Sequence, residues 1–447
     1  MNELLRIGQT VVDPSSGQTF HVDEYLGGGS QGEVYRASVG NAQVAIKWFY
    51  PRYLTQDARQ LERIERAVLI GPPSGSFLWP EGIVQSADAD GFGYVMAIRE
   101  PRFRGMAELV TRQIEPSFRA LTTAGFELAN AFLQLHARGL CYRDISFGNV
   151  FFDPATGNVQ ICDNDNVDVD GQPGSIGGTA RFMAPELVTG AESPSTQSDL
   201  FSLAVLLFYL LMNHHPLEGA KEAEIRCFDL PAMTLLYGSR PVFVFDPGDA
   251  SNRPVPGLHD NVLAFWPIYP ASLRTLFTRA FTAGMHDPQN RVRESEWRSA
   301  LIELRDSLFP CGACGAENFY DPAALRAADG SAYTNSPCWA CGRSLQLPPR
   351  MRITRGRDAF VVMLANGASL YPHHTDAGHA YCFDEPRAYL QRHPNMPEVL
   401  GLTNLSGQSW TATTAAAETI TVPPGRSVTL KDGVKIQFGD SEGEVRT

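Results

Sequence analysis

Four cysteines of this 447-residue chain have the spacing of metal ligands. Cys311 and Cys314 form one Cys-x-x-Cys pair, Cys338 and Cys341 form a second, and glycine follows each pair. Two such pairs can surround one tetrahedral Zn²⁺ with four thiolates, whereas a redox centre needs only one pair. A closed four-thiolate site has no open position for a substrate, so we expect structural zinc. The four remaining cysteines read as ordinary buried residues.

A second group of side chains offers oxygen atoms. In "YRDISFGNVFFDPATGNVQICDND", Asp144 falls in an expected turn, Asn149 follows it, and Asp163 comes after an apolar hairpin. Carboxylate and amide oxygens suit Mg²⁺, a hard ion that takes one or two protein ligands together with waters and phosphates. This donor set is therefore compatible with phosphate chemistry.

A glycine-rich motif near the N-terminus could approach the phosphates. "LGGGSQGEVY" contains Gly27-x-Gly29-x-x-Gly32, and glycines let backbone amides come close to phosphate oxygens with no side chain in the way. Alone, such a motif more often marks a plain hairpin turn. The next strand, "VAIK", places Lys47 one hairpin later, pointing to where the α- and β-phosphates would lie.

Lys47 needs a carboxylate to hold it. The helix expected in "DARQLERIERAVLI" offers Glu62 and Glu65. We predict Glu65, because the apolar Val68 and Leu69 that follow it give the better register. Glu62 stays open as the alternative, since boundaries inferred from sequence can slip by one turn.

The order of these motifs, continued by "GTARFMAPE" and "SDLFSLAVLLFYLL", resembles a eukaryotic-type protein kinase. The resemblance implies an α+β, bilobal fold with a β-rich N-lobe and a helical C-lobe. It also implies that "FMAPE" ends an activation segment and that Arg291 pairs with Glu186.

Catalytic roles follow from the same resemblance. Asp144 would orient or deprotonate the attacking hydroxyl, Asn149 and Asp163 would hold Mg²⁺ against the phosphates of ATP, and Lys47 with Glu65 would position those phosphates. Met96 would be the gatekeeper, and Ala97 to Ile98 the hinge. The implied nucleotide-binding residues are Leu26, Gly27, Gly29, Gly32, Val34, Ala45, Lys47, Met96, Ala97, Ile98 and Phe151.

Some positions depart from the kinase pattern. Ser146 stands where serine/threonine kinases usually have lysine, which removes a charge near the transferring phosphoryl group. Asn164 and Asp165 replace the last two residues of Asp-Phe-Gly. Asp165 could join the metal site or serve only in a turn, and the sequence favours neither. Arg143 could dock a phosphorylated residue such as Ser175.

Charge and periodicity bound the whole chain. A formal net charge of -12, with no Lys/Arg block, argues against a nucleic-acid or membrane-surface partner. The longest apolar run, residues 200–212, is too short to span a bilayer, so we expect a cytoplasmic protein. Periodicity predicts a small sheet with one helix over 1–97, a larger helical lobe over 98–308 and short β runs after the cysteine pairs. The kinase resemblance implies that the first two are a kinase N-lobe and C-lobe. The cysteine pairs indicate a zinc ribbon over 309–346, and the β runs indicate a small all-β sandwich over 350–447.

The last of these segments resembles a degenerate forkhead-associated β-sandwich through "VLGLTNLSGQSW" and "VPPGRSVTLKDGVKIQFGD". Pro372 stands where the histidine of its Ser-x-x-His motif would fall. We therefore expect an interaction module that does not select phosphothreonine. A generic β-sandwich is the alternative.

These resemblances together imply an ATP- and Mg²⁺-dependent serine/threonine protein kinase that acts on a protein substrate. The chain is similar to kinases of the tellurite-resistance-associated triad, which implies a metal-dependent protein phosphatase and a von Willebrand A protein as partners. The alternative is a nucleotide-binding pseudokinase scaffold. Retention of Lys47, Asp144, Asn149 and Asp163 favours the enzyme.

Overall fold

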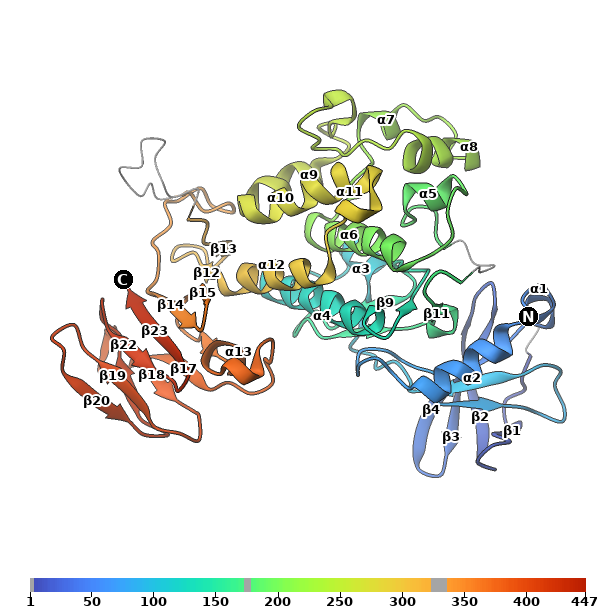
Figure 1. Ribbon diagram of the computed structural model, residues 1–447, viewed down its shortest axis with the longest axis horizontal. Coiled ribbons are helices and arrows are strands. Elements are labelled where there is room, and N and C mark those ends of the chain that lie inside the picture. The colour runs from blue at the N-terminus through green and yellow to red at the C-terminus, as the bar shows by residue number, and fades with distance from the viewer. Residues whose placement is uncertain (1–3, 173–177, 323–335) are drawn as a thin grey trace. The chain divides into compact units, whose positions relative to one another are not determined.

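The computed structural model describes residues 4–172, 178–322 and 336–447 (Figure 1). The chain divides into two compact units, Met1–Pro267 with Arg274–Ser299, and Ile268–Leu273 with Ala300–Thr447. The first unit is β-rich and then helical, and the second carries the four-cysteine cluster and further β-sheets. The predicted α+β class is confirmed, while the four predicted domain boundaries stay predictions.

An antiparallel sheet of six strands opens the first unit, in the order β1-β2-β3-β4-β6-β5. Alternation of apolar residues along the strands gives it two buried faces. Trp48 and Tyr35 pack in one cluster, whereas Ala45, Tyr94 and Met96 pack in another. The strands are β1 Thr10–Val12, β2 Thr19–Gly28, β3 Gly32–Val39, β4 Ala42–Phe49, β5 Gly82–Val84 and β6 Gly93–Met96.

Helices α1 (Pro51–Gln56) and α2 (Gln60–Ile70) follow β4. The buried residues of α2 are Gln60, Arg63, Ile64 and Ala67, which recur at helical spacing and form one stripe. Ile64 joins the cluster of Ala45, Tyr94 and Met96. This stripe decides which α2 side chains can reach the sheet.

The helical region is built around α6 (Thr196–Met212), in which every residue from Ser198 to Met212 is buried. Its uniform apolar sequence is explained by packing on all sides, and Ser195 caps its N-terminus through Ser198. The other helices are α3 Met106–Val110, α4 Phe118–His136, α5 Pro185–Val188, α7 Ala220–Ala223, α8 Leu230–Met233, α9 Asp260–Phe265, α10 Ala271–Ala280, α11 Ala283–His286 and α12 Glu294–Asp306.

Short strands, one just before α3 and the others between α4 and α5, flank the candidate catalytic residues. One sheet has the order β10-β9-β7, and β11 pairs with β8. Their antiparallel pairing holds two turns, one between β8 and β9 and one after β10. The strands are β7 Arg104–Gly105, β8 Leu140–Cys141, β9 Val150–Phe152, β10 Val159–Ile161 and β11 Asp168–Val169.

In the second unit, β12 (Leu308–Pro310) pairs with β13 (Glu317–Phe319) ahead of two larger sheets. Those sheets have the orders β15-β14-β23-β22-β19-β20 and β16-β17-β18-β21, with an apolar core between them. The elements are β14 Arg350–Arg355, β15 Asp358–Met363, β16 Ser369–Leu370, α13 Pro372–Thr375, β17 Ala388–His393, β18 Met396–Asn404, β19 Trp410–Thr413, β20 Thr419–Val422, β21 Ser427–Thr429, β22 Lys435–Gln437 and β23 Ser441–Arg446. Among the described helices, none is both long enough and apolar enough to cross a bilayer.

Candidate functional site

The turn between β8 and β9 presents Asp144. The backbone N–H and the hydroxyl of Thr179 donate to Asp144 Oδ1 at 3.1 and 3.0 Å, and Asn149 Nδ2 donates to Oδ2 at 3.2 Å. The same Asn149 nitrogen donates to the Asp144 carbonyl oxygen at 2.8 Å. The Asn149 side-chain oxygen, the atom a cation would bind, is left available by this arrangement.

Asp163 follows β10 in a left-handed conformation, with φ 57° and ψ 40°. Lys47 of β4 donates to its Oδ1 at 2.5 Å, and the Asp163 side chain is 33% exposed. The peptide N–H of Cys162 donates to the Asn149 carbonyl at 2.8 Å, so the Asn149 and Asp163 backbones lie side by side. The structure thus brings Lys47, Asn149 and Asp163 into one neighbourhood.

Lys47 has a second carboxylate partner, Asp165. The ammonium donates to Asp165 Oδ1 at 2.9 Å and Oδ2 at 3.0 Å, and to Gln31 Oε1 at 2.6 Å. Tyr94 donates its hydroxyl to Asp165 Oδ1 at 3.0 Å, and Gln60 Nε2 donates to Oδ2 at 3.3 Å. Each Asp165 oxygen therefore has two donors.

The protonation state of this pair follows from those donors. Burial alone lowers the pKa of Lys47, but the charges of Asp163 and Asp165 outweigh burial and raise it above its ordinary value. Burial raises the pKa of Asp165, and Lys47 opposes that shift. The raised pKa of Lys47 favours the ion pair, whereas the raised pKa of Asp165 favours a neutral carboxylic acid. We assign the ion pair, because a proton on Asp165 would face a donor at either oxygen.

The structure does not bring the predicted Glu65 to Lys47. Glu65 is exposed, and so is the alternative Glu62, which pairs with Arg66. Both lie off the buried stripe of α2, and the residue of that stripe nearest the Lys47 cluster is the neutral Gln60. Among the described residues, the carboxylates paired with Lys47 are Asp163 and Asp165.

Asn164 and Asp165 both point into protein. Asn164 is fully buried and donates through Nδ2 to the carbonyls of Leu78 and Ile161 at 2.7 and 2.9 Å. The sequence leaves two roles open for Asp165, an extra metal ligand or a turn residue. Neither includes the contact with Lys47 that the structure shows.

The implied adenine residues mostly share one apolar cluster. Ala45 and Met96 are buried in it and are cross-strand neighbours, and Val34 and Ile98 pack against it. Leu26, Gly29 and Ala97 are exposed, Gly27 and Phe151 are half-buried, and the Arg99 guanidinium lies 4.3 Å from the Phe151 ring centre.

Gly32 has a packing reason to be glycine. A Cβ there would lie 2.1 Å from the Trp48 carbonyl oxygen, so no larger residue fits between β3 and β4. Its identity therefore does not by itself point to phosphate binding.

Arg143 already faces a carboxylate. Its guanidinium lies 3.4 Å from Asp168 Oδ2, and Arg66 of α2 donates to Asp168 Oδ1 at 2.9 Å. Ser175, the residue expected to dock there when phosphorylated, lies outside the described residues. The expected ion pair of Arg291 with Glu186 is present at 2.8 Å.

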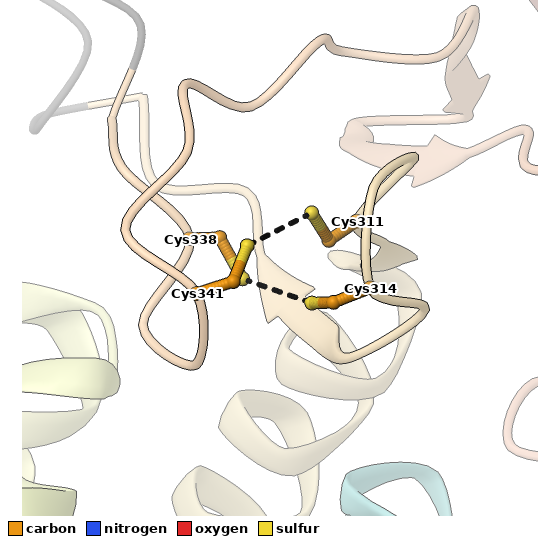
Figure 2. Close-up of side chains that lie close together, drawn as sticks. All are labelled: Cys311, Cys314, Cys338 and Cys341. Atoms are coloured by element: carbon orange, nitrogen blue, oxygen red, sulfur yellow. Dashed lines mark hydrogen bonds between the residues drawn. The ribbon is translucent and has the colours of Figure 1, made fainter.

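The four cysteines converge from two similar turns (Figure 2). Gly315 donates to the Cys311 carbonyl and Gly342 to the Cys338 carbonyl, each at 2.9 Å, and both glycines have positive φ. The Sγ atoms of Cys311 and Cys341 are 3.9 Å apart, and those of Cys314 and Cys338 are 3.7 Å apart. Zn–S bonds of about 2.3 Å in a tetrahedron put sulfurs about 3.8 Å apart, so the cluster could bind zinc.

Amide donors favour the thiolate of Cys338, whereas at Cys314 a backbone N–H is outweighed by desolvation and the neighbouring thiols, which raise the pKa to about 11. Desolvation opposes ionisation of Cys338, but the N–H groups of Cys341 and Ala340 and the Asn318 amide lower its pKa to about 6. Asn318 Nδ2 lies 3.6 Å from the Cys338 sulfur. Such donors are the usual second layer around zinc-bound thiolates.

A buried group of Asp306, His373 and His374 also has metal-ligand side chains, and sequence reasoning missed it. The backbone N–H groups of Tyr371 and Tyr381 donate to Nδ1 of His374 and His373 at 2.8 and 2.9 Å. Each Nδ1 is therefore an acceptor, so each neutral ring carries its proton on Nε2. His374 Nε2 lies 3.2 Å from Asp306, and a cation there would displace that proton. The group fits a structural hydrogen bond better than a metal site.

Comparison with known proteins agrees with the geometry. Residues 84–242 match the protein kinase domain model, a range that begins after Lys47. Protein kinase MCK1 of Saccharomyces cerevisiae is 32% identical over 113 residues, which is 25% of this chain and 30% of that protein. The cell cycle serine/threonine-protein kinase CDC5/MSD2 of the same yeast is 26% identical over 213 residues, 45% of this chain and 29% of that protein.

The matched segments thus span less than a third of either relative. The range matched by the kinase domain model includes Asp144, Asn149 and Asp163. This chain contains a protein kinase domain, with a β-rich N-terminal region and a helical middle, followed by a four-cysteine cluster and β-sheets.

Proposed function

We propose that the chain is a serine/threonine protein kinase that transfers the γ-phosphoryl group of ATP to a hydroxyl of a protein substrate. The observation that carries this proposal is the environment of Asp144. Its Oδ1 accepts two hydrogen bonds from Thr179 and its Oδ2 one from Asn149. A carboxylate fixed in this way can orient a substrate hydroxyl and accept its proton.

The other residues supply phosphate and metal binding. Asp163 and Asn149 offer the oxygen ligands that suit Mg²⁺, which would supply positive charge beside the phosphates. Lys47 would contact the phosphates from β4. The hydroxyl oxygen would form the new O–P bond as the bond from the γ-phosphorus to the bridging oxygen breaks, leaving ADP.

The segments after the kinase domain have proposed roles of their own. The four-cysteine cluster would hold one structural Zn²⁺, because its four sulfurs leave no open ligand position. The two-sheet segment would be an interaction module of forkhead-associated type, without selectivity for phosphothreonine. The expected phosphatase and von Willebrand A partners rest on sequence resemblance and stay predictions.

Incubation of the full chain with radiolabelled ATP, Mg²⁺ and a mixed library of Ser and Thr peptides tests the proposal. We expect label on serine or threonine, and a loss of about 100- to 10,000-fold in Asp144→Asn. Asp163→Ala should lose transfer to a similar extent. Nucleotide binding without transfer above the Asp144→Asn level would identify a pseudokinase scaffold instead.

A further inference from the structure

Lys47 donates hydrogen bonds to three side chains, and Asp165 is more buried than the other two, Gln31 and Asp163. Asp165 is 1% exposed and Lys47 is 5% exposed. Gln31 is half-buried, and the Asp163 side chain is 33% exposed. Gln31 lies in the glycine-rich turn, and Asp163 is the proposed metal ligand. Both acceptors are therefore needed elsewhere, or must move aside, when nucleotide and Mg²⁺ bind.

Asp165 is held by donors from the sheet and from α2. Tyr94, one of its donors, is the cross-strand neighbour of Lys47 in the β4–β6 pair. Gln60, its other donor, comes from the buried stripe of α2 and also contacts the Asp165 carbonyl at 3.3 Å. Because these donors and Lys47 occupy both carboxylate oxygens, Asp165 has no free position for a metal ion.

The proposed function needs one buried carboxylate to hold Lys47, and α2 presents an amide instead. We propose that Asp165 is the positioning residue for Lys47, taking the part that Glu65 was expected to play; this rests on the proposed function. The carboxylate comes from the turn that also carries Asp163. Residues 163–165 thus position both Lys47, through Asp165, and the proposed metal ligand Asp163. No carboxylate from α2 is needed to hold the lysine.

The first test is a double-mutant cycle on nucleotide affinity, measured with a fluorescent ATP analogue and Mg²⁺. Lys47→Met and Asp165→Asn should each weaken binding, and the double variant should be no weaker than Lys47→Met alone. Asp88→Asn, an exposed aspartate of the same unit, is the matched control. Additive losses would overturn the proposal, because Asp165 would then act independently of Lys47.

The second test moves the charge. Asp165→Asn should lower kcat at least 100-fold, and Gln60→Glu combined with Asp165→Asn should recover at least tenfold of that loss by returning a carboxylate to the cluster. Thermal unfolding of each variant reports on folding. Absence of rescue in a folded double variant, or an equal loss of kcat in Glu65→Gln, would overturn the proposal.

These two tests separate the proposal from the proposed function. If the wild-type chain binds nucleotide but transfers no phosphate, the proposed function fails. The affinity cycle then decides on Asp165 alone, because it needs no turnover.

Discussion

At the scale of single residues, Thr179 controls the direction of the Asp144 carboxylate. Its backbone N–H and hydroxyl converge on Oδ1, while Asn149 contacts Oδ2, so rotation of the carboxylate would break contacts on both sides. The hydroxyl contact is the one that a substitution can remove without changing the backbone.

We expect Thr179→Val to lower kcat about ten- to hundredfold, because a hydrogen bond to a charged group is worth roughly 1.5–3 kcal/mol. KM for ATP should change little, because the side chain of Thr179 contacts Asp144 and not one of the residues implied to bind the nucleotide. Thr179→Ser keeps the hydroxyl and is the matched control. Steady-state kinetics in which the valine and serine variants lose equally would show that the hydroxyl has no orienting role.

At the scale of elements, three helices meet at His136. Its Nε2 lies 3.2 Å from Asp199 of α6, and its Nδ1 contacts Glu294 of α12. Asp199 Oδ1 also accepts the Arg143 backbone N–H at 3.0 Å, which links this junction to the turn that holds Asp144. With a carboxylate at each ring nitrogen, the imidazole is protonated.

This junction predicts a pH dependence of stability. Burial lowers the pKa of His136, but Asp199 and Glu294 overcome it and raise the pKa to about 9 from an unfolded value of 6.5. The contribution is therefore complete below about pH 6.5 and disappears as pH rises through about 9. It amounts to roughly 3 kcal/mol at most, since one pKa unit is about 1.4 kcal/mol.

Urea unfolding at pH 6.5 and 9.5 checks this expectation. The free energy of unfolding should fall between the two values in the wild type, and fall less in His136→Gln. Equal falls in both proteins would assign the pH dependence to other groups.

At the scale of the whole molecule, the sequence located the residues whose neighbours are close along the chain. Asp144 and Asn149 share one turn, and each cysteine pair shares another, so motif spacing was enough to group them. The partner of Lys47 could not be found this way, because it depends on how α2 is rotated against the sheet. Two of the buried positions of α2 are the polar residues Gln60 and Arg63. Because buried positions are normally recognised by apolar residues, the sequence does not reveal which face of α2 is buried or that Glu65 lies off that face.

The same limit applies to the chain after the kinase domain. The sequence predicts a zinc ribbon and a β-sandwich as separate domains, and that division stays a prediction. Both segments belong to one compact unit of the structure. Cys311, Cys338 and Leu345 pack in a common apolar cluster with Met363 of β15. Such a contact between distant segments leaves no periodic signal in the sequence.

That shared cluster makes zinc removal informative. We expect about one Zn²⁺ per chain by metal analysis, because four thiolates complete one tetrahedral site. Chelation, or Cys311→Ser with Cys341→Ser, should raise amide hydrogen exchange in residues 308–320 and also in β15, since loss of the metal frees the cysteines that pack against Met363.

Nucleotide affinity, measured with Mg²⁺ in excess after the zinc has been removed, should stay unchanged, because Lys47, Asp163 and the cluster around Ala45 belong to the other unit. Cys227→Ser should keep both zinc and exchange protection, because Cys227 lies outside the cluster and is exposed, contrary to the expectation that it is buried. Zinc-free protein from a reducing preparation would contradict the metal assignment. Exchange that rises at the cysteine turns but not in β15 would show that the zinc site and the sandwich are stable independently of each other.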